Sequence, residues 1–147
     1  VHMHNKQDCV FVCVLNGGFM FFSDLVKRLP NDIVCDFVKT TSYTKQTQSI
    51  TVLVNLIPRD LDAKHVYIVD DIYDSGKTMQ RLIEVFSERN PKSINVVTLF
   101  KRAMSPDLDS TIKHFYGTRI ATEWLVGYGM NDDGNRYRNS NAVYKID

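Results

Sequence analysis

Residues 66–79 read VYIVDDIYDSGKTM. The first four residues are apolar and mostly β-branched, which predicts a short buried strand at residues 66–69. Apolar residues then recur at helical spacing from Met79 to Phe86, until Asn90-Pro91 stops the pattern. The stretch therefore predicts a strand, a polar loop and a helix in direct succession.

Strand and helix patterns alternate outward from this unit. Phe22, Leu25, Val26 and Leu29 share one helical face. The predicted strands are residues 9–15, 33–39, 50–56, 66–69, 94–100 and, less regularly, 114–116, followed by a short apolar piece at residues 124–126. The polar segment 40–49 is predicted to be the exposed tip of a hairpin, and residues 127–141 a loop rich in Gly, Asn and Asp.

This alternation predicts an α/β fold with a parallel central sheet flanked by helices. Ligands of such sheets bind beyond the carboxyl ends of the strands. We therefore expect three strand-end segments, residues 16–18, 70–78 and 101–102, to converge on one crevice.

Composition limits the class of protein. The 147 residues, 44% of them hydrophobic, suit a single domain over residues 1–147. A net charge of +1 argues against a nucleic-acid partner, and no apolar run approaches the roughly 20 residues of a membrane span. The three cysteines form no CxxC pair, which is typical of a cytoplasmic protein with reduced thiols.

The loop of the 66–79 unit offers a phosphate site. Backbone N–H groups at the start of a helix bind anions, and Gly76-Lys77-Thr78 suggests a nucleotide P-loop. That motif requires glycine at position 71, where this chain has Asp71, so a P-loop is excluded. Carboxylates at Asp70, Asp71 and Asp74 instead suit sugar hydroxyls, a bound Mg2+ or a general base. The plainer alternative is that Asp74 or Ser75 caps the helix while the other acids are solvated.

The 66–79 stretch closely resembles the phosphoribosyl pyrophosphate motif of type I phosphoribosyltransferases. The rest of the chain, residues 8–146, resembles the hypoxanthine-guanine branch of that family. The resemblance rests on Leu15-Asn16-Gly17-Gly18 with FMFFSDL after it, Ser42-Tyr43, LFKR at 99–102 and WLVGYG at 124–129. It implies the type I phosphoribosyltransferase fold, with a small hood formed by C-terminal segments and an N-terminus shorter than is usual in the family.

The resemblance implies a purine salvage enzyme that uses Mg2+, phosphoribosyl pyrophosphate and a purine base, as a homodimer or homotetramer. Asp74 would be the catalytic acid/base at the purine N7, and Ser42-Tyr43 would form a mobile loop. Phosphoribosyl pyrophosphate or the nucleotide would be bound by Leu15, Asn16, Gly17, Gly18, Asp70, Asp71, Asp74, Ser75, Gly76, Lys77, Thr78 and Arg138. The purine would be bound by Ile72, Lys101, Trp124 and Leu125, and the metal by Asp70, Asp71, Asn131 and Asp132. A cis peptide is also implied at Leu15-Asn16.

Residue pattern alone leaves plainer alternatives open. Lys101 and Arg138 are equally compatible with solvated cations, and Trp124 with a packing residue. Two positions depart from the family: Asn16 replaces a usual lysine, and Asn131 a frequent aspartate. The alternatives to a hypoxanthine-guanine enzyme are a xanthine-preferring relative and a regulatory or inactive protein that senses phosphoribosyl pyrophosphate.

Overall fold

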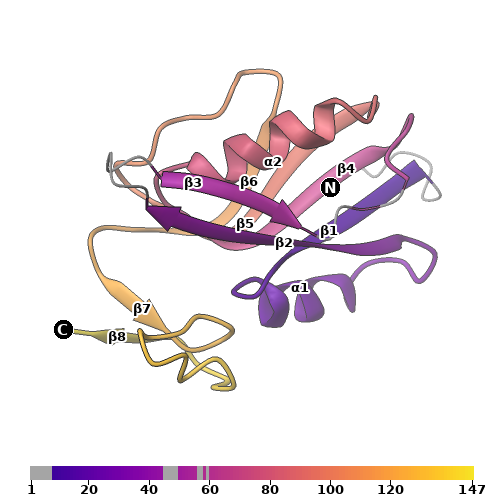
Figure 1. Cartoon of the computed structure of the whole chain (residues 1–147). Coiled ribbons are helices and arrows are strands. Elements are labelled where there is room, and N and C mark those ends of the chain that lie inside the picture. The colour runs from indigo at the N-terminus through magenta and orange to yellow at the C-terminus, as the bar shows by residue number, and fades with distance from the viewer. Residues whose placement is uncertain (1–7, 45–49, 56–57, 59) are drawn as a thin grey trace.

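The structure, a computed structural model, describes residues 8–44, 50–55, 58 and 60–147. Six strands form the central sheet in the order β3-β2-β1-β4-β5-β6, and two short strands, β7 and β8, form a separate antiparallel pair (Figure 1). All neighbours in the large sheet are parallel except β2 and β3, so the predicted α/β class is confirmed. The elements are β1 (Cys9–Leu15), α1 (Phe19–Val26), β2 (Val34–Thr44), β3 (Ile50–Asn55), β4 (His65–Tyr73), α2 (Lys77–Ser87), β5 (Ser93–Arg102), β6 (Lys113–Ile120), β7 (Trp124–Val126) and β8 (Tyr144–Ile146).

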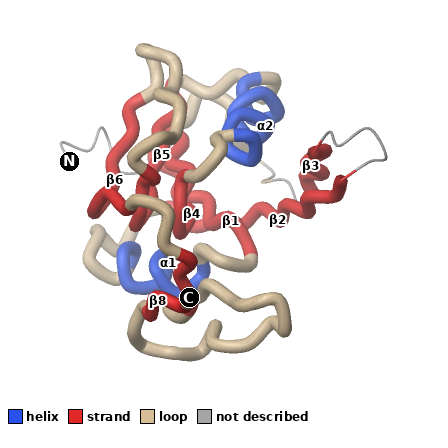
Figure 2. The backbone as a smooth tube through the Cα atoms, turned by 90° about the vertical axis from the view of Figure 1, so that its left-hand side faces the viewer, coloured by secondary structure: helices blue, strands red, loops and turns tan. Residues whose placement is uncertain are grey.

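The two helices cover opposite faces of the sheet, as Figures 1 and 2 both show. On β1, Val10, Val12 and Val14 belong to the apolar cluster that includes α2. The alternate residues of that strand, such as Phe11, join the cluster that includes α1. Side chains on a strand alternate between faces, so a continuous apolar run is what a strand buried on both sides requires.

The C-terminal segment forms the expected hood, which we define as residues 121–146. It contains β7 and β8 and lies on the α1 side of the molecule, away from α2 (Figure 2). Strand β8 was not predicted, because a three-residue strand leaves no periodic pattern. No helix within the described ranges is long and apolar enough to cross a membrane.

The prediction of a loop at residues 40–49 is wrong for residues 40–44. Residues 40–44 continue β2 and pair with β3, with Thr40 opposite Val54. β-Branched threonines suit an antiparallel ribbon, but polar residues give no alternation to detect when the strand is exposed. Residues 45–49 lie outside the described part of the chain.

The strand of the 66–79 unit is longer than predicted. Asp70 and Ile72 still pair with Thr98 and Phe100 of β5, so β4 runs to Tyr73. Strand pairing therefore continues past the apolar residues and fixes the backbone of the acidic pair. The first helix is displaced as well: it begins at Phe19, directly after Gly18, and ends at Val26 rather than near Leu29.

Candidate active site

A cavity of about 400 Å³ opens at the carboxyl ends of the parallel strands. The three strand-end segments meet there, as expected from the fold class, and the hood closes one side. Of the residues predicted for the site, the lining includes Leu15, Asn16, Gly17, Asp70, Asp71, Ile72, Asp74, Ser75, Gly76, Thr78, Trp124, Leu125, Asn131 and Arg138. Residues separated by more than 100 positions therefore share one site.

The other predicted residues lie outside this lining. Gly18 caps α1, Lys77 opens α2, and Ser42 is an exposed residue of β2. Tyr43 pairs with Thr51 through the backbone of β2 and β3. Lys101 and Asp132 are engaged in ion pairs elsewhere, as described below.

The acidic pair lies at the floor of the cavity. Loss of hydration, with the neighbouring Asp71 carboxylate second, raises the pKa of Asp70 well above its usual range. Each carboxylate also accepts a hydrogen bond from the next backbone amide: Asp71 N to Asp70 Oδ1 at 2.9 Å and Ile72 N to Asp71 Oδ1 at 2.8 Å. These bonds hold both side chains in place beside the strand.

Two adjacent carboxylates, one of them poorly hydrated, are the donor chemistry that a divalent cation neutralises. Within the described residues no group of three His, Cys, Asp or Glu side chains forms a metal site built from protein alone. Mg2+ ordinarily takes only one or two carboxylates and completes its shell with water and substrate phosphates. The residues present therefore fit Mg2+ held jointly with a phosphorylated ligand.

The start of α2 supplies the anion site. Gly76 precedes the helix with φ of 80°, a left-handed conformation, and Ser75 and Thr78 face the same cavity. The first amides of a helix have no partner inside the helix, and the dipole places partial positive charge there. This end of α2 is therefore suited to a phosphate group.

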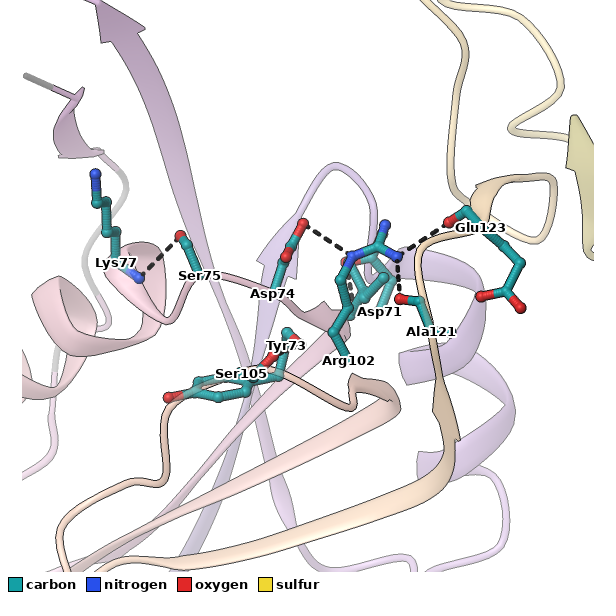
Figure 3. A network of polar contacts seen from close by, with 10 residues as sticks. Asp71, Tyr73, Asp74, Ser75, Lys77, Arg102, Ser105, Ala121 and Glu123 are labelled. Atoms are coloured by element: carbon teal, nitrogen blue, oxygen red, sulfur yellow. Dashed lines mark hydrogen bonds and ion pairs between the residues drawn. The ribbon is translucent and has the colours of Figure 1, made fainter. Parts of the chain in front are cut away.

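Arg102, the last residue of β5, is a cavity residue to which sequence analysis gave no role. Its Nε lies 3.1 Å from Asp74 Oδ2, and its Nη1 donates to the carbonyls of Ala121 and Glu123 at 3.0 Å each (Figure 3). Two consecutive cations look alike in sequence, and only the path of the backbone at the end of β5 decides which of them reaches the cavity.

Lys101, the other cation, is almost fully buried. Its Nζ lies 2.8 Å from Asp107 Oδ1 and 5.5 Å from the centre of the Tyr116 ring. The side chain is thus neither solvated nor in the cavity lining, and its assignment to the purine stays a prediction.

The hood is fastened to the sheet side by a few close contacts. The Tyr128 hydroxyl donates to Asp24 of α1, and burial followed by this hydrogen bond raises the pKa of Tyr128 to about 12. Gly129 has φ of +97°, and a Cβ there would lie 2.3 Å from the carbonyl oxygen of Gly17. Arg138 supports the same turn through Nη1, which donates to Gly129 O at 2.7 Å. The hood thus rests directly on the 16–18 loop.

Two further features of the loops bear on the predictions. The Leu15-Asn16 peptide is cis, as the resemblance implied. Asp132 forms an ion pair with Arg136, Oδ2 to Nη2 at 2.7 Å, and lies outside the cavity lining, whereas Asn131 is part of it. The amide of Asn131 donates to Asn135 Oδ1 at 3.1 Å.

Comparisons with known proteins show the family and the fold. Residues 1–133 match the family described as phosphoribosyl transferase domain. A hypoxanthine phosphoribosyltransferase of Buchnera aphidicola is 33% identical over 99% of this chain and 82% of the relative. A hypoxanthine-guanine-xanthine phosphoribosyltransferase of Tritrichomonas foetus is 33% identical over 92% of this chain and 74% of the relative. A crystal structure of a hypoxanthine-guanine phosphoribosyltransferase from Bacillus anthracis superposes with a TM-score of 0.81, at 31% identity, over 97% of this chain and 82% of that one.

Proposed function

Because this chain belongs to the phosphoribosyltransferase family, and to its hypoxanthine-guanine branch, we propose that it transfers the 5-phosphoribosyl group of phosphoribosyl pyrophosphate to hypoxanthine or guanine. The products are IMP or GMP and pyrophosphate. The observation that carries the proposal is the meeting of Asp70–Asp71, the start of α2 and Trp124 around one cavity. Each of the three suits a different part of the nucleotide: ribose, phosphate and base.

The sugar phosphate occupies the side of the cavity next to β4 and α2. The 5′-phosphate accepts hydrogen bonds from the amides at the start of α2 and from the hydroxyls of Ser75 and Thr78. Asp70 and Asp71 accept from the ribose hydroxyls, and with Asn131 they would hold Mg2+. When bound, that ion supplies neutralisation of the charge that develops on the leaving pyrophosphate.

The leaving pyrophosphate faces Asn16 and Gly17, on the 16–18 loop. Close approach of the backbone is possible at Gly17, where a Cβ would already lie 2.5 Å from Asp71 Oδ2. Arg138 lines the same cavity and contributes positive charge. Closure of residues around Ser42-Tyr43 would exclude water from the cationic sugar.

The base lies against Trp124, with Leu125 and Ile72 at its edges. Trp124 lines the cavity and is half-exposed, so its indole is available for a purine ring to stack on. As N9 bonds to C1′ and the C1′–O bond to pyrophosphate breaks, Asp74 takes the proton from N7. A contact of Lys101 with the purine O6 would use an N–H of the ammonium that is not donated to Asp107.

The remaining parts of the proposal concern organisation. We propose that residues 1–147 act as one domain and that two or four copies associate. We also place the protein in the cytoplasm, in keeping with the three free cysteines.

The test is spectrophotometric turnover of hypoxanthine, guanine and xanthine with phosphoribosyl pyrophosphate and Mg2+. Asp74→Asn should lower kcat by roughly 10²–10⁴-fold, the usual contribution of a general acid or base. Asp32→Asn is the matched control, because Asp32 is exposed and precedes β2 at the opposite end of the sheet. Turnover of xanthine in preference to the other bases would identify the xanthine-preferring alternative. Binding of phosphoribosyl pyrophosphate without any turnover would instead favour a sensor or an inactive copy.

A further inference from the structure

Asp74 and the segment that leads into the strand of Trp124 are about fifty positions apart, yet the side chain of Arg102 contacts both. We propose that Arg102 is a positioning residue that fixes the Asp74 carboxylate to the entry of the hood. Seating of the base against Trp124 and alignment of the acid/base group at N7 are then one event. This inference rests on the proposed function. It assigns to Arg102 the role of linking the orientation of Asp74 to the position of Trp124.

The geometry at Arg102 carries the inference. The guanidinium uses different nitrogens for its two sets of partners: Nε contacts Asp74, and Nη1 donates to the carbonyls of Ala121 and Glu123. Figure 3 shows the group lying between the two segments, with the Glu123 carboxylate turned away from it. Glu123 thus contributes its main chain, and the next residue along the chain is Trp124.

The two ends of this bridge differ in how firmly they are held. The Arg102 side chain is only 18% exposed, whereas that of Asp74 is 62% exposed. An exposed carboxylate has several rotamers available, and a pair formed in water is weak unless one partner is already fixed. Arg102 is fixed by the two carbonyls, so it can select one orientation for Asp74.

The chemistry of the cation is specific to arginine. A guanidinium is planar and presents donors in fixed directions, so it can satisfy a carboxylate and two carbonyls simultaneously. A lysine has a single ammonium on a flexible chain and cannot span the same three oxygens with that geometry. The neighbouring Lys101 cannot substitute, because its ammonium is paired with Asp107.

Loss of the Arg102 contacts should weaken binding of the base and slow proton transfer together, and it should leave binding of the sugar phosphate unchanged. The acidic pair and the start of α2 make no contact with Arg102 among the described interactions. Arg102→Gln should therefore lower kcat by roughly 10–100-fold, the effect of a misplacement of about 1 Å. The KM for the base should rise severalfold, while that for phosphoribosyl pyrophosphate should change by less than about twofold.

The experiment combines kinetics with the fluorescence of Trp124, the single tryptophan of the chain. Wild type, Arg102→Gln, Arg102→Lys and the control Arg89→Gln are compared, since Arg89 is exposed near the far end of α2. Without ligand, Arg102→Gln should shift the emission of Trp124 and increase its quenching by acrylamide. Arg102→Lys should give an intermediate kcat and emission, and Arg89→Gln should match wild type.

A double-mutant cycle separates positioning from a general loss of structure. In an Asp74→Asn background, Arg102→Gln should lower the residual kcat by less than about threefold, because the group it positions is gone. Multiplication of the two losses, or unchanged Trp124 fluorescence in Arg102→Gln, would overturn the proposal. A wild-type protein without turnover would refute the proposed function instead, and the ligand-free fluorescence would still decide whether Arg102 fixes the hood.

Discussion

The two sides of the cavity are built by different means. On the phosphate side, β4 and α2 stand on the apolar cluster, and the side chains of Leu82 and Phe86 are completely buried. On the base side, the hood has two three-residue strands and is joined to the sheet by Arg102, by the bond from Tyr128 to Asp24 and by the contact of Gly129 with Gly17. The first side is held by burial of a large apolar cluster, the second by a few directional contacts and the buried side chains of Val126 and Met130.

This difference indicates which side of the cavity determines the stability of the fold and which determines selectivity for the base. Apolar burial is cooperative and contributes to the folding of the whole sheet, so its loss is felt everywhere. Directional contacts at one edge can fail locally while the sheet persists. Substitutions on the phosphate side should therefore change the free energy of unfolding, and substitutions in the hood should change affinity for the base.

Phe86→Ala should give the largest effect and tests the first half of the comparison. Removing a fully buried phenyl group costs about 3–5 kcal/mol of the free energy of unfolding, measured by urea denaturation. The folded fraction should keep its KM for the base. Phe115→Ala, at a partly exposed position, should lose much less than Phe86→Ala. An equal loss in the two variants would show that apolar burial under α2 is not what holds the phosphate side.

Gly129→Ala should have the next largest effect, and it should fall on affinity. The added Cβ would collide with the Gly17 carbonyl, and the left-handed backbone disfavours alanine by roughly 1–2 kcal/mol. We expect the KM for the base to rise at least about tenfold, with a smaller change in the melting temperature. Gly134→Ala is the control in the same hood, because its nearest neighbour is the flexible Arg136 side chain. A large fall in melting temperature without a change in KM would contradict the comparison.

Tyr128→Phe removes one hydrogen bond and should have a moderate effect. Its hydroxyl donates to Asp24, so the loss should be about 1 kcal/mol, or roughly fivefold in base affinity. Quenching of Trp124 fluorescence by IMP, whose base would occupy the same part of the cavity, measures this change in affinity. Tyr144→Phe, with an exposed ring, should behave as wild type. If the two tyrosines gave the same result, the bond to α1 would not be holding the hood.

The smallest predicted effect is the pH dependence of stability that His114, on strand β6 of the central sheet, contributes. Burial, with Lys101 second, lowers the pKa of His114 to about 4, and the unfolded chain has an ordinary value near 6.5. Between pH 4 and 6.5 the imidazole binds more protons in the unfolded state, so the contribution of His114 to stability is fully present above this window and falls as pH falls through it. The melting temperature should drop by a few degrees more in wild type than in His114→Gln. Identical pH profiles of the two proteins would remove His114 as the cause.

Sequence alone predicted the sheet side better than the hood. The apolar residues of β1 and β4 are continuous runs, and the alternation of strand and helix gives the parallel order. The acidic pair and the start of α2 follow directly from residues 66–79, since neighbours in sequence must be neighbours in the site. The convergence of three strand ends was predictable for the same reason, because parallel strands end at the same edge.

The parts that sequence did not predict depend on local backbone direction and on tertiary contacts. Nothing in the order Lys101-Arg102 says that the first would meet Asp107 and the second Asp74. Thr40 lines the cavity only because β2 continues beyond its apolar residues. Sequence also left both Asn131 and Asp132 as metal residues, and only the loop conformation, which pairs Asp132 with Arg136, separates the two.

The contact of Gly17 with Gly129 also determines which positions are open to change. A methyl group at Gly129 would collide with the Gly17 carbonyl, and one at Gly17 would collide with the Asp71 carboxylate, so neither glycine can acquire one without displacing a neighbour. Trp124 and Leu125, in contrast, line the cavity away from that contact. A directed-evolution library for altered base preference should yield active variants at these two positions and almost none at the two glycines. Lineages that diverge in the purine they accept would then share the same loop contact and differ in the surface that faces the base.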